Sequence, residues 1–154
     1  MGIDPGTATT GWGVVEGNAS DYHFISVGII TTASMLEPAA RLATIFQDLN
    51  QLLKKFSPDE VAIEQLFFNT NAKTALVVGQ ARGVVMLAVE LANIPLFSYT
   101  PLQVKMAITG YGRADKRQMQ EMVKQLLKLS SVPKPDDAAD ALAVALTHGF
   151  SLRI

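Results

Sequence analysis

The sequence contains no cysteine, so disulfide bonds, thiolate metal sites and cysteine nucleophiles are excluded, and the chain suits a reducing compartment. It has only two histidines, His23 and His148, which we interpret as structural residues, although His148 near a predicted helix end could face a functional cleft. No apolar run is expected to reach the length of a membrane span. The first residues, from Met1 to Asp4, lack a basic and apolar leader, so we expect a cytoplasmic protein without membrane contact.

The 154 residues have a globular composition, with 49% hydrophobic and 18% charged side chains, and their number fits a single domain spanning residues 1–154. The charges are unevenly distributed. Residues 1–65 carry three basic and eight acidic side chains, whereas residues 66–134 carry nine basic and three acidic ones. A basic middle beside acidic ends suits an anion-binding surface next to an acidic metal site. Ordinary domains show similar asymmetry, so charge alone leaves both interpretations open.

Apolar patterns with strand and helix periods follow one another along the chain. Short β-branched runs predict five strands, at residues 1–4, 12–17, 22–32, 61–67 and 95–99. Amphipathic spacing and capping residues predict helices at residues 38–56, 69–93, 101–108, 115–129 and 136–149. This order predicts an α/β fold, namely a mixed five-stranded sheet with helices on both faces.

Four carboxylates occupy chemically informative positions: Asp4, Glu64, Asp137 and Asp140. Asp4 ends a strand, Glu64 interrupts an apolar run, and the last two share one face of a helix near its start. Each also has a plain structural explanation. Asp4 could be a turn residue and Glu64 a partner in a cross-strand ion pair. Asp136 or Asp137 could cap the helix, with Asp140 interacting with its dipole.

A cluster of these four carboxylates would repel itself unless cations neutralised it. Hard divalent cations such as Mg²⁺ prefer carboxylate oxygens as ligands. In two-metal phosphodiesterases, ions about 4 Å apart hold the attacking water and the leaving oxygen of an in-line displacement. The four acids therefore predict metal-assisted hydrolysis at phosphorus, with two Mg²⁺ ions per active site.

Five segments and the spacing between them carry a family resemblance. They are Gly2-Ile3-Asp4-Pro5-Gly6, Thr10-Gly11-Trp12-Gly13, Ala62-Ile63-Glu64-Gln65, Gly79-Gln80-Ala81-Arg82-Gly83 and Asp137-Ala138-Ala139-Asp140-Ala141-Leu142. From Met1 to His148, the chain resembles the RuvC-type Holliday junction resolvases of the ribonuclease H-like superfamily. The resemblance implies a crossover junction endodeoxyribonuclease that nicks two opposing strands of a four-way DNA junction symmetrically, in homologous recombination and DNA repair.

The resemblance also implies roles for individual residues. It assigns metal binding and catalysis to Asp4, Glu64, Asp137 and Asp140, with Mg²⁺ as the ion and Mn²⁺ as an alternative. Phe67 matches the aromatic residue that stacks on unpaired bases, and Phe68 is a possible helper. Lys105 and Lys116 match positions that hold backbone phosphates. Charge and placement add four further DNA-binding candidates, for which a solvated helix surface is the alternative: Arg82, Arg113, Arg117 and Lys124.

Two kinds of protein partner are implied in the same way. Family members act as homodimers, and the helix at residues 69–93 is the expected contact, because its small residues Gly79, Ala81 and Gly83 permit close two-fold packing. Cooperation with the branch-migration complex of RuvA-type and RuvB-type proteins is the second expectation.

Three other functions fit part of the pattern. An actin-like ATPase or sugar kinase opens with a similar phosphate-binding turn, but it needs two such domains and this chain has room for one. Another ribonuclease H-like nuclease, acting on RNA or linear DNA, would carry the same acids. A module that binds branched DNA without cutting it would not need four intact carboxylates.

Overall fold

The computed structural model describes residues 1–18, 21–65 and 71–152. Within these residues the strands are β1 (Gly2–Asp4), β2 (Thr9–Asn18), β3 (Asp21–Thr31), β4 (Val61–Glu64) and β5 (Leu96–Tyr99). The helices are α1 (Pro38–Phe56), α2 (Ala72–Leu91), α3 (Pro101–Thr109), α4 (Lys116–Leu126) and α5 (Asp136–Ser151). The predicted elements are therefore all present, and β2 is several residues longer than expected.

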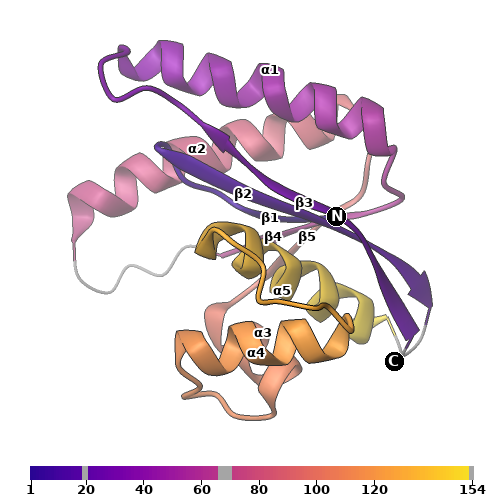
Figure 1. The fold of residues 1–154 in the computed structure, drawn as a ribbon. Coiled ribbons are helices and arrows are strands. Elements are labelled where there is room, and N and C mark those ends of the chain that lie inside the picture. Colours follow the sequence, from indigo (N-terminus) through magenta and orange to yellow (C-terminus); the bar gives the residue numbers. More distant parts are fainter. Residues whose placement is uncertain (19–20, 66–70, 153–154) are drawn as a thin grey trace.

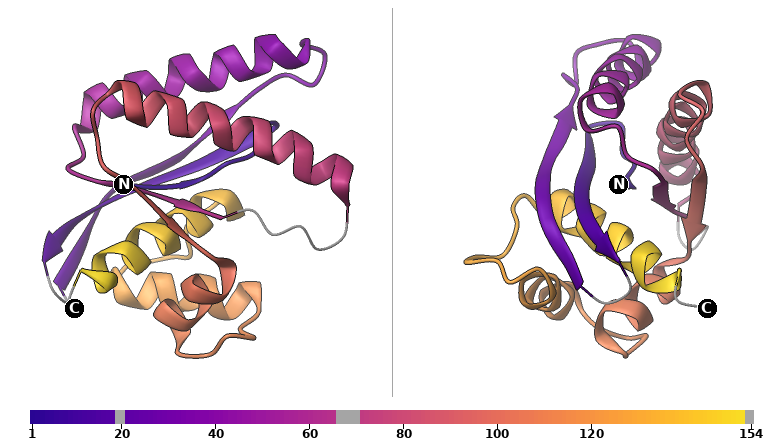
Figure 2. Two further views of the ribbon diagram at one scale, coloured as in Figure 1. Left: turned by 180° about the vertical axis from the view of Figure 1, so that it is seen from behind. Right: turned by 90° about the vertical axis from the view of Figure 1, so that its right-hand side faces the viewer.

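The strands form one mixed sheet in the order β3-β2-β1-β4-β5, with helices on both faces (Figure 1). β1, β2 and β3 pair antiparallel, whereas β4 lies parallel to both β1 and β5. α1 and α2 cover one face, and α5 crosses the other with α3 and α4 beside it (Figure 2). The predicted α/β architecture is confirmed.

Successive side chains of each strand point to opposite faces of the sheet, so the buried side chains form two separate cores. Ile3, Val61 and Ile63 point toward α1 and α2 and pack with residues such as Ile45 and Val85. The intervening residue Ala62 packs with Leu142 of α5 and with side chains of α3 and α4. Since side chains alternate between the two faces of a sheet, the residues at positions 2, 4 and 64 lie on the α5 side.

α5 packs directly on the backbone of β1 and β2 because glycines face it. A Cβ added to Gly2 would lie 2.1 Å from the Ala141 carbonyl oxygen, and one added to Gly11 would lie 1.9 Å from that of Asp137. A Cβ on Gly13 would meet the Leu142 side chain at 2.7 Å. These approaches leave no room for any side chain at the three positions. The glycines thus bring the N-terminal turn of α5 close to the end of β1.

α2 corrects one expectation. Among the described residues, this helix is long enough and apolar enough to cross a membrane by length and composition, contrary to the prediction that no run would be. One of its faces, with Ala81, Val85, Ala88 and Val89, is buried in the core beside α1. A second apolar face is exposed, which explains why the helix is apolar all round.

Candidate metal and nucleic-acid site

The parallel pairing of β1 and β4 brings Asp4 and Glu64 to the same edge of the sheet. Gly2 is paired with Ala62 and Ile3 with Ile63, so Asp4 and Glu64 each end their strand next to the other. The carboxyl ends of parallel strands are where α/β proteins place their ligands. The turn after Asp4 is held by the buried Thr10, whose hydroxyl donates to the Gly6 carbonyl oxygen at 2.7 Å. The position of Asp4 is therefore fixed from both sides.

The start of α5 supplies the second pair of acids. Asp4 is paired with Gly11 on β2, and the Asp137 carbonyl lies directly over Gly11. The N-terminal turn of α5 is therefore stacked on the residue next to Asp4. The N-cap is Pro135, without a side-chain cap hydrogen bond, so neither Asp136 nor Asp137 caps the helix as the structural alternative required. Their carboxylates are left for other interactions.

Three of the four predicted carboxylates meet in one group. Asp4, Asp137 and Asp140 each offer one oxygen, and these oxygens all lie within 4.8 Å of one another. Glu64 is not part of this close group. It faces the same region, since it lines a cavity of about 250 Å³ together with Asp140, Lys105 and Lys116. All-oxygen donors gathered at this spacing fit a hard divalent cation.

Raised pKa values of carboxyl groups at the site indicate that nearby cations do not fully neutralise its negative charge. Burial, together with the carboxylates of Glu64, Asp140 and Asp137, raises the pKa of Asp4 to about 7. Burial and the Asp140 carboxylate also raise the pKa of Glu64 above its usual range, and Lys105 and Lys116 only partly offset this. Burial likewise raises the pKa of Asp140. A bound cation would remove this repulsion.

Lys116 is one cation that the chain itself supplies, and it contacts two carboxylates directly. Its Nζ lies 3.2 Å from an Asp140 oxygen and 3.3 Å from an Asp136 oxygen. Asp136 is oriented in turn by Gln120, whose side-chain amide donates to its second oxygen at 2.9 Å. Partial burial opposes the charge on Lys116, but the two carboxylates outweigh it and raise the pKa of the ammonium. The hydrogen bonds from Gln120 and Lys116 lower the pKa of Asp136.

Arg82 is held by internal partners. Its guanidinium donates to the Glu64 carbonyl oxygen at 3.4 Å and to the Ser98 hydroxyl at 3.1 Å. These contacts join α2 to the ends of β4 and β5, and they give Arg82 a part in holding the backbone of Glu64.

A sequence model of the family described as "Crossover junction endodeoxyribonuclease RuvC" matches residues 1–148. The chain belongs to the RuvC family.

Curated relatives of the same description agree along the whole chain. The protein from Rubrobacter xylanophilus is 56% identical over 154 residues, which cover 100% of this chain and 86% of the relative. The one from Roseiflexus sp. is 52% identical over 151 residues, which cover 98% of this chain and 90% of the relative. Both relatives are described as crossover junction endodeoxyribonucleases, and the family to which this chain belongs has the same description. Membership of this family rules out the alternative of an actin-like ATPase or sugar kinase.

The solved RuvC structures have the same fold. Thermus thermophilus RuvC in complex with a Holliday junction substrate superposes with a TM-score of 0.93 at 37% identity, over 99% of this chain and 93% of that one. A yeast mitochondrial Holliday junction resolvase, Ydc2, shares the fold at 16% identity, with a TM-score of 0.65 over 95% of this chain and 76% of that one. The predicted ribonuclease H-like fold is confirmed.

The other predicted DNA-binding residues belong to α3, to α4 and to the turn between these helices. Arg113 and Arg117 are exposed, in the turn before α4 and at its start, while Lys124, farther along α4, lies 4.0 Å from Glu121. Lys105 lies on α3 beside Glu64. The structure thus places these cations on α3, α4 and the turn between them. Phe67 and Phe68 lie outside the described residues.

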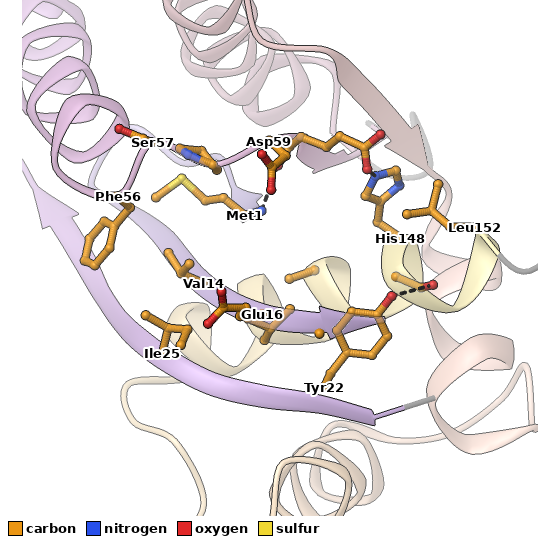
Figure 3. A pocket seen from close by; sticks show the side chains of 16 residues that line it. Met1, Val14, Glu16, Tyr22, Ile25, Phe56, Ser57, Asp59, His148 and Leu152 are labelled. Atoms are coloured by element: carbon orange, nitrogen blue, oxygen red, sulfur yellow. Dashed lines mark hydrogen bonds and ion pairs between the residues drawn. The ribbon is translucent and has the colours of Figure 1, made fainter. Parts of the chain in front are cut away.

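His148 does not face the acidic group, which corrects the expectation that it could. It lies at the far end of α5, where its ring lines a different cavity of about 330 Å³ with Glu16, Tyr22 and Asp59 (Figure 3). Sequence reasoning also missed Asp136 and Gln120, whose role depends on a contact between α4 and the start of α5. A second acid directly before Asp137 at the helix start was the signal available for Asp136.

Proposed function

We propose that this protein resolves four-way DNA junctions by symmetric, divalent-metal-dependent nicking of two opposing strands, in homologous recombination and DNA repair. The observation that carries the proposal is the convergence of Asp4, Asp137 and Asp140 within 4.8 Å, in a chain that belongs to the RuvC family. The Thermus relative solved with a Holliday junction supports junction DNA as the substrate.

Mg²⁺ is the proposed ion, with two ions per site and Mn²⁺ as a substitute. Asp4, Asp137 and Asp140 would hold one ion, and Glu64, on the same cavity, would extend the set to a second. Bound at these carboxylates, such ions would supply an activated water and would stabilise the departing 3′ oxygen. The contribution of the protein is to hold four oxygen donors on two strand ends and one helix, elements that fix their separation.

The cations beside the carboxylates are proposed to bind the DNA backbone. Lys105 and Lys116 line the cavity with Glu64 and Asp140, so a phosphate placed over the acids would lie within their reach. Arg113, Arg117 and Lys124 extend the positive surface along α4, and Arg82, which also supports the backbone of Glu64, is a further proposed DNA contact. Base stacking by Phe67, with Phe68 as helper, completes the proposed interface.

A second copy of the chain is the proposed partner of α2. Its exposed residues Leu76, Gln80, Gly83, Leu87 and Leu91 follow the three-and-four spacing of one helix face, and they lie away from the buried side. Leu87, for example, is 53% exposed. A two-fold contact along this stripe would bury apolar surface and present two acidic groups to opposing strands. Cooperation with RuvA-type and RuvB-type proteins in the cytoplasm is part of the same proposal.

Incubation with a synthetic four-way junction and Mg²⁺, followed by mapping of the nicks, tests the function. We expect paired nicks at symmetric positions. Asp137→Asn and Glu64→Gln should abolish cutting but keep junction binding, because each removes a metal ligand without adding bulk. Asp59→Asn, an exposed acid at the far end of the sheet, is the matched control and should cut normally.

Three results would overturn the proposal or part of it. Preferential cutting of RNA or linear DNA would favour another ribonuclease H-like nuclease. Junction binding without cutting by the unaltered protein would favour the binding module. Metal-dependent nicking by Glu64→Gln would remove Glu64 from the site.

A further inference from the structure

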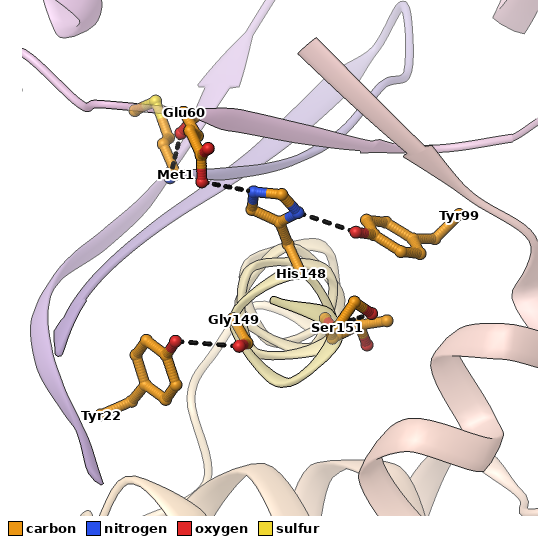
Figure 4. A network of polar contacts seen from close by, with 8 residues as sticks. Met1, Tyr22, Glu60, Tyr99, His148, Gly149 and Ser151 are labelled. Atoms are coloured by element: carbon orange, nitrogen blue, oxygen red, sulfur yellow. Dashed lines mark hydrogen bonds and ion pairs between the residues drawn. The ribbon is translucent and has the colours of Figure 1, made fainter. Parts of the chain in front are cut away.

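A buried histidine joins α5 to the residue before β4 and to the last residue of β5. His148 is 5% exposed, and both of its ring nitrogens have a partner (Figure 4). Its Nε2 lies 2.8 Å from a carboxylate oxygen of Glu60, and its Nδ1 lies 2.7 Å from the Tyr99 hydroxyl. The ring also stacks on Phe97 at a centroid distance of 4.4 Å. A histidine held this completely has one available orientation.

The donors and acceptors in this network are matched. A carboxylate oxygen only accepts, so the histidine Nε2 donates to Glu60. The Tyr99 hydroxyl can donate or accept, so it satisfies Nδ1 whichever proton arrangement the ring adopts. Removing either partner would leave a buried nitrogen without its hydrogen bond, and such groups are costly.

The partners of His148 belong to the two strands beside the acidic group. Glu60 immediately precedes β4, and Glu64 is the last residue of that strand. Tyr99 is the last residue of β5, where it is paired with Glu64, and its carbonyl accepts from the Gln65 amide at 2.7 Å. One side-chain network thus connects both ends of the short β4 strand to α5.

α5 carries this connection to the two aspartates. Asp137 and His148 are eleven residues apart, which is about three turns and about 16 Å of helix. The two residues therefore project from nearly the same side. Between them the helix meets β1 through Gly2, Ala141 and Ala145, and small residues interlock little. The polar contacts of His148 add a directional restraint on α5, beside the apolar packing of Leu142 and Leu146, that resists sliding or rotation over β4 and β5.

We propose that the Glu60–His148–Tyr99 network positions α5 against β4 and β5, and so sets the separation of Glu64 from Asp137 and Asp140. His148 and its partners are positioning residues, because their side-chain hydrogen bonds join them to one another and not to a carboxylate of the site. The inference rests on the proposed metal site.

The test compares two tyrosine hydroxyls that anchor neighbouring residues of α5. Tyr99→Phe removes the contact to His148. Tyr22→Phe is the matched control, because the Tyr22 hydroxyl donates to the Gly149 carbonyl at 2.9 Å but ties the helix to β3, away from Glu64. Mn²⁺ affinity of the full chain, measured without DNA by electron paramagnetic resonance well below the melting temperature, is the readout.

We expect Tyr99→Phe and Glu60→Ala each to weaken Mn²⁺ binding between about threefold and thirtyfold, the range typical of residues that couple distant parts of a protein. Glu60→Gln, which keeps an acceptor for Nε2, should restore most of the affinity. The double variant Glu60→Ala/Tyr99→Phe should lose little more than either single one, because both changes release the same helix. Tyr22→Phe should bind Mn²⁺ normally, even where its melting temperature falls.

Equal Mn²⁺ affinity in Tyr99→Phe and the unaltered protein would overturn the inference, and so would equal losses in Tyr99→Phe and Tyr22→Phe. Asp137→Asn in the same assay separates the two proposals. If it abolishes Mn²⁺ binding while Tyr99→Phe does not alter it, the metal site stands and the positioning role fails. If Asp137→Asn binds Mn²⁺ normally, the metal site fails and the positioning role with it.

Discussion

The substitution Gly11→Ala should disable the metal site without touching an acidic residue. The new Cβ would lie 1.9 Å from the Asp137 carbonyl oxygen and 2.4 Å from its carbon, both backbone atoms that cannot rotate away. Ordinary contact begins at 3.4 Å, so β2 and the start of α5 must separate by about 1.5 Å. Overpacking of this kind costs about 1–3 kcal/mol of stability. The protein should still fold, with a lower melting temperature.

The larger effect should be on metal binding. Mg²⁺ holds its oxygen ligands at about 2.0–2.1 Å and tolerates little distortion. A movement of about 1.5 Å therefore takes Asp137 and Asp140 out of reach of an ion that is also bound to Asp4. We expect Mn²⁺ or Mg²⁺ affinity, measured by calorimetry without DNA, to fall at least about tenfold, as for other disturbances of ligand orientation.

Gly83→Ala is the matched control for this experiment. A Cβ at Gly83 meets no atom within 4 Å, and the residue is exposed on α2, so metal affinity should be unchanged. A Gly11→Ala protein that is destabilised but binds the ion with full affinity would refute the reasoning, because it would show that the acids do not depend on close packing of α5.

Three further predictions follow from the site and from α2. Because the pKa of Asp4 is raised to about 7, the metal-free folded state binds a proton more tightly than the unfolded chain, whose aspartates titrate near 3.9. Stability in chelator should therefore fall as pH rises from about 4 to 7, and Asp4→Asn should flatten this dependence in thermal melts; parallel pH curves of the two proteins would contradict it. Lys116→Ala should raise Mn²⁺ affinity without DNA by up to about fivefold, since it frees Asp140. The same change should reduce the slope of log junction affinity against log salt concentration by about one. Weaker Mn²⁺ binding, or an unchanged salt slope, would count against this prediction. Leu87→Glu should convert dimer to monomer in light scattering, whereas Leu102→Glu, at a similarly exposed leucine of α3, should not; a dimeric Leu87→Glu would exclude the α2 contact.

Much of the fold could be predicted because its signals are local. The capping box of Asp115 with Gln118 starts α4 where the sequence indicated, and the predicted helix at 38–56 matches α1. Strand periodicity located all five strands, although β2 begins at Thr9 because its pairing with β3 extends beyond its β-branched run. The expectation that no apolar run would reach the length of a membrane span was wrong for α2, because the glutamine and arginine within it interrupt the run of apolar residues without ending the helix.

The acidic group was predictable for a different reason. Its residues lie in short segments whose order and spacing carry the family resemblance, so the four carboxylates could be named before their separation was known. The individual patterns left structural alternatives open. Only the packing of α5 on Gly11 showed that Asp137 and Asp140 meet Asp4, and only the cavity showed Glu64 facing Asp140 and Lys116.

The amino-acid sequence by itself determined which elements form, which family the chain resembles and which acids are available for chemistry, because periodicity, capping and motif spacing are written in neighbouring residues. The tertiary structure decided what each side chain contacts. It assigned Arg82 to the backbone of Glu64, Asp136 to Lys116, and His148 to partners 49 and 88 residues away rather than to the acids. Such pairings depend on how strands and helices cross in space, and residue spacing along the chain does not record that.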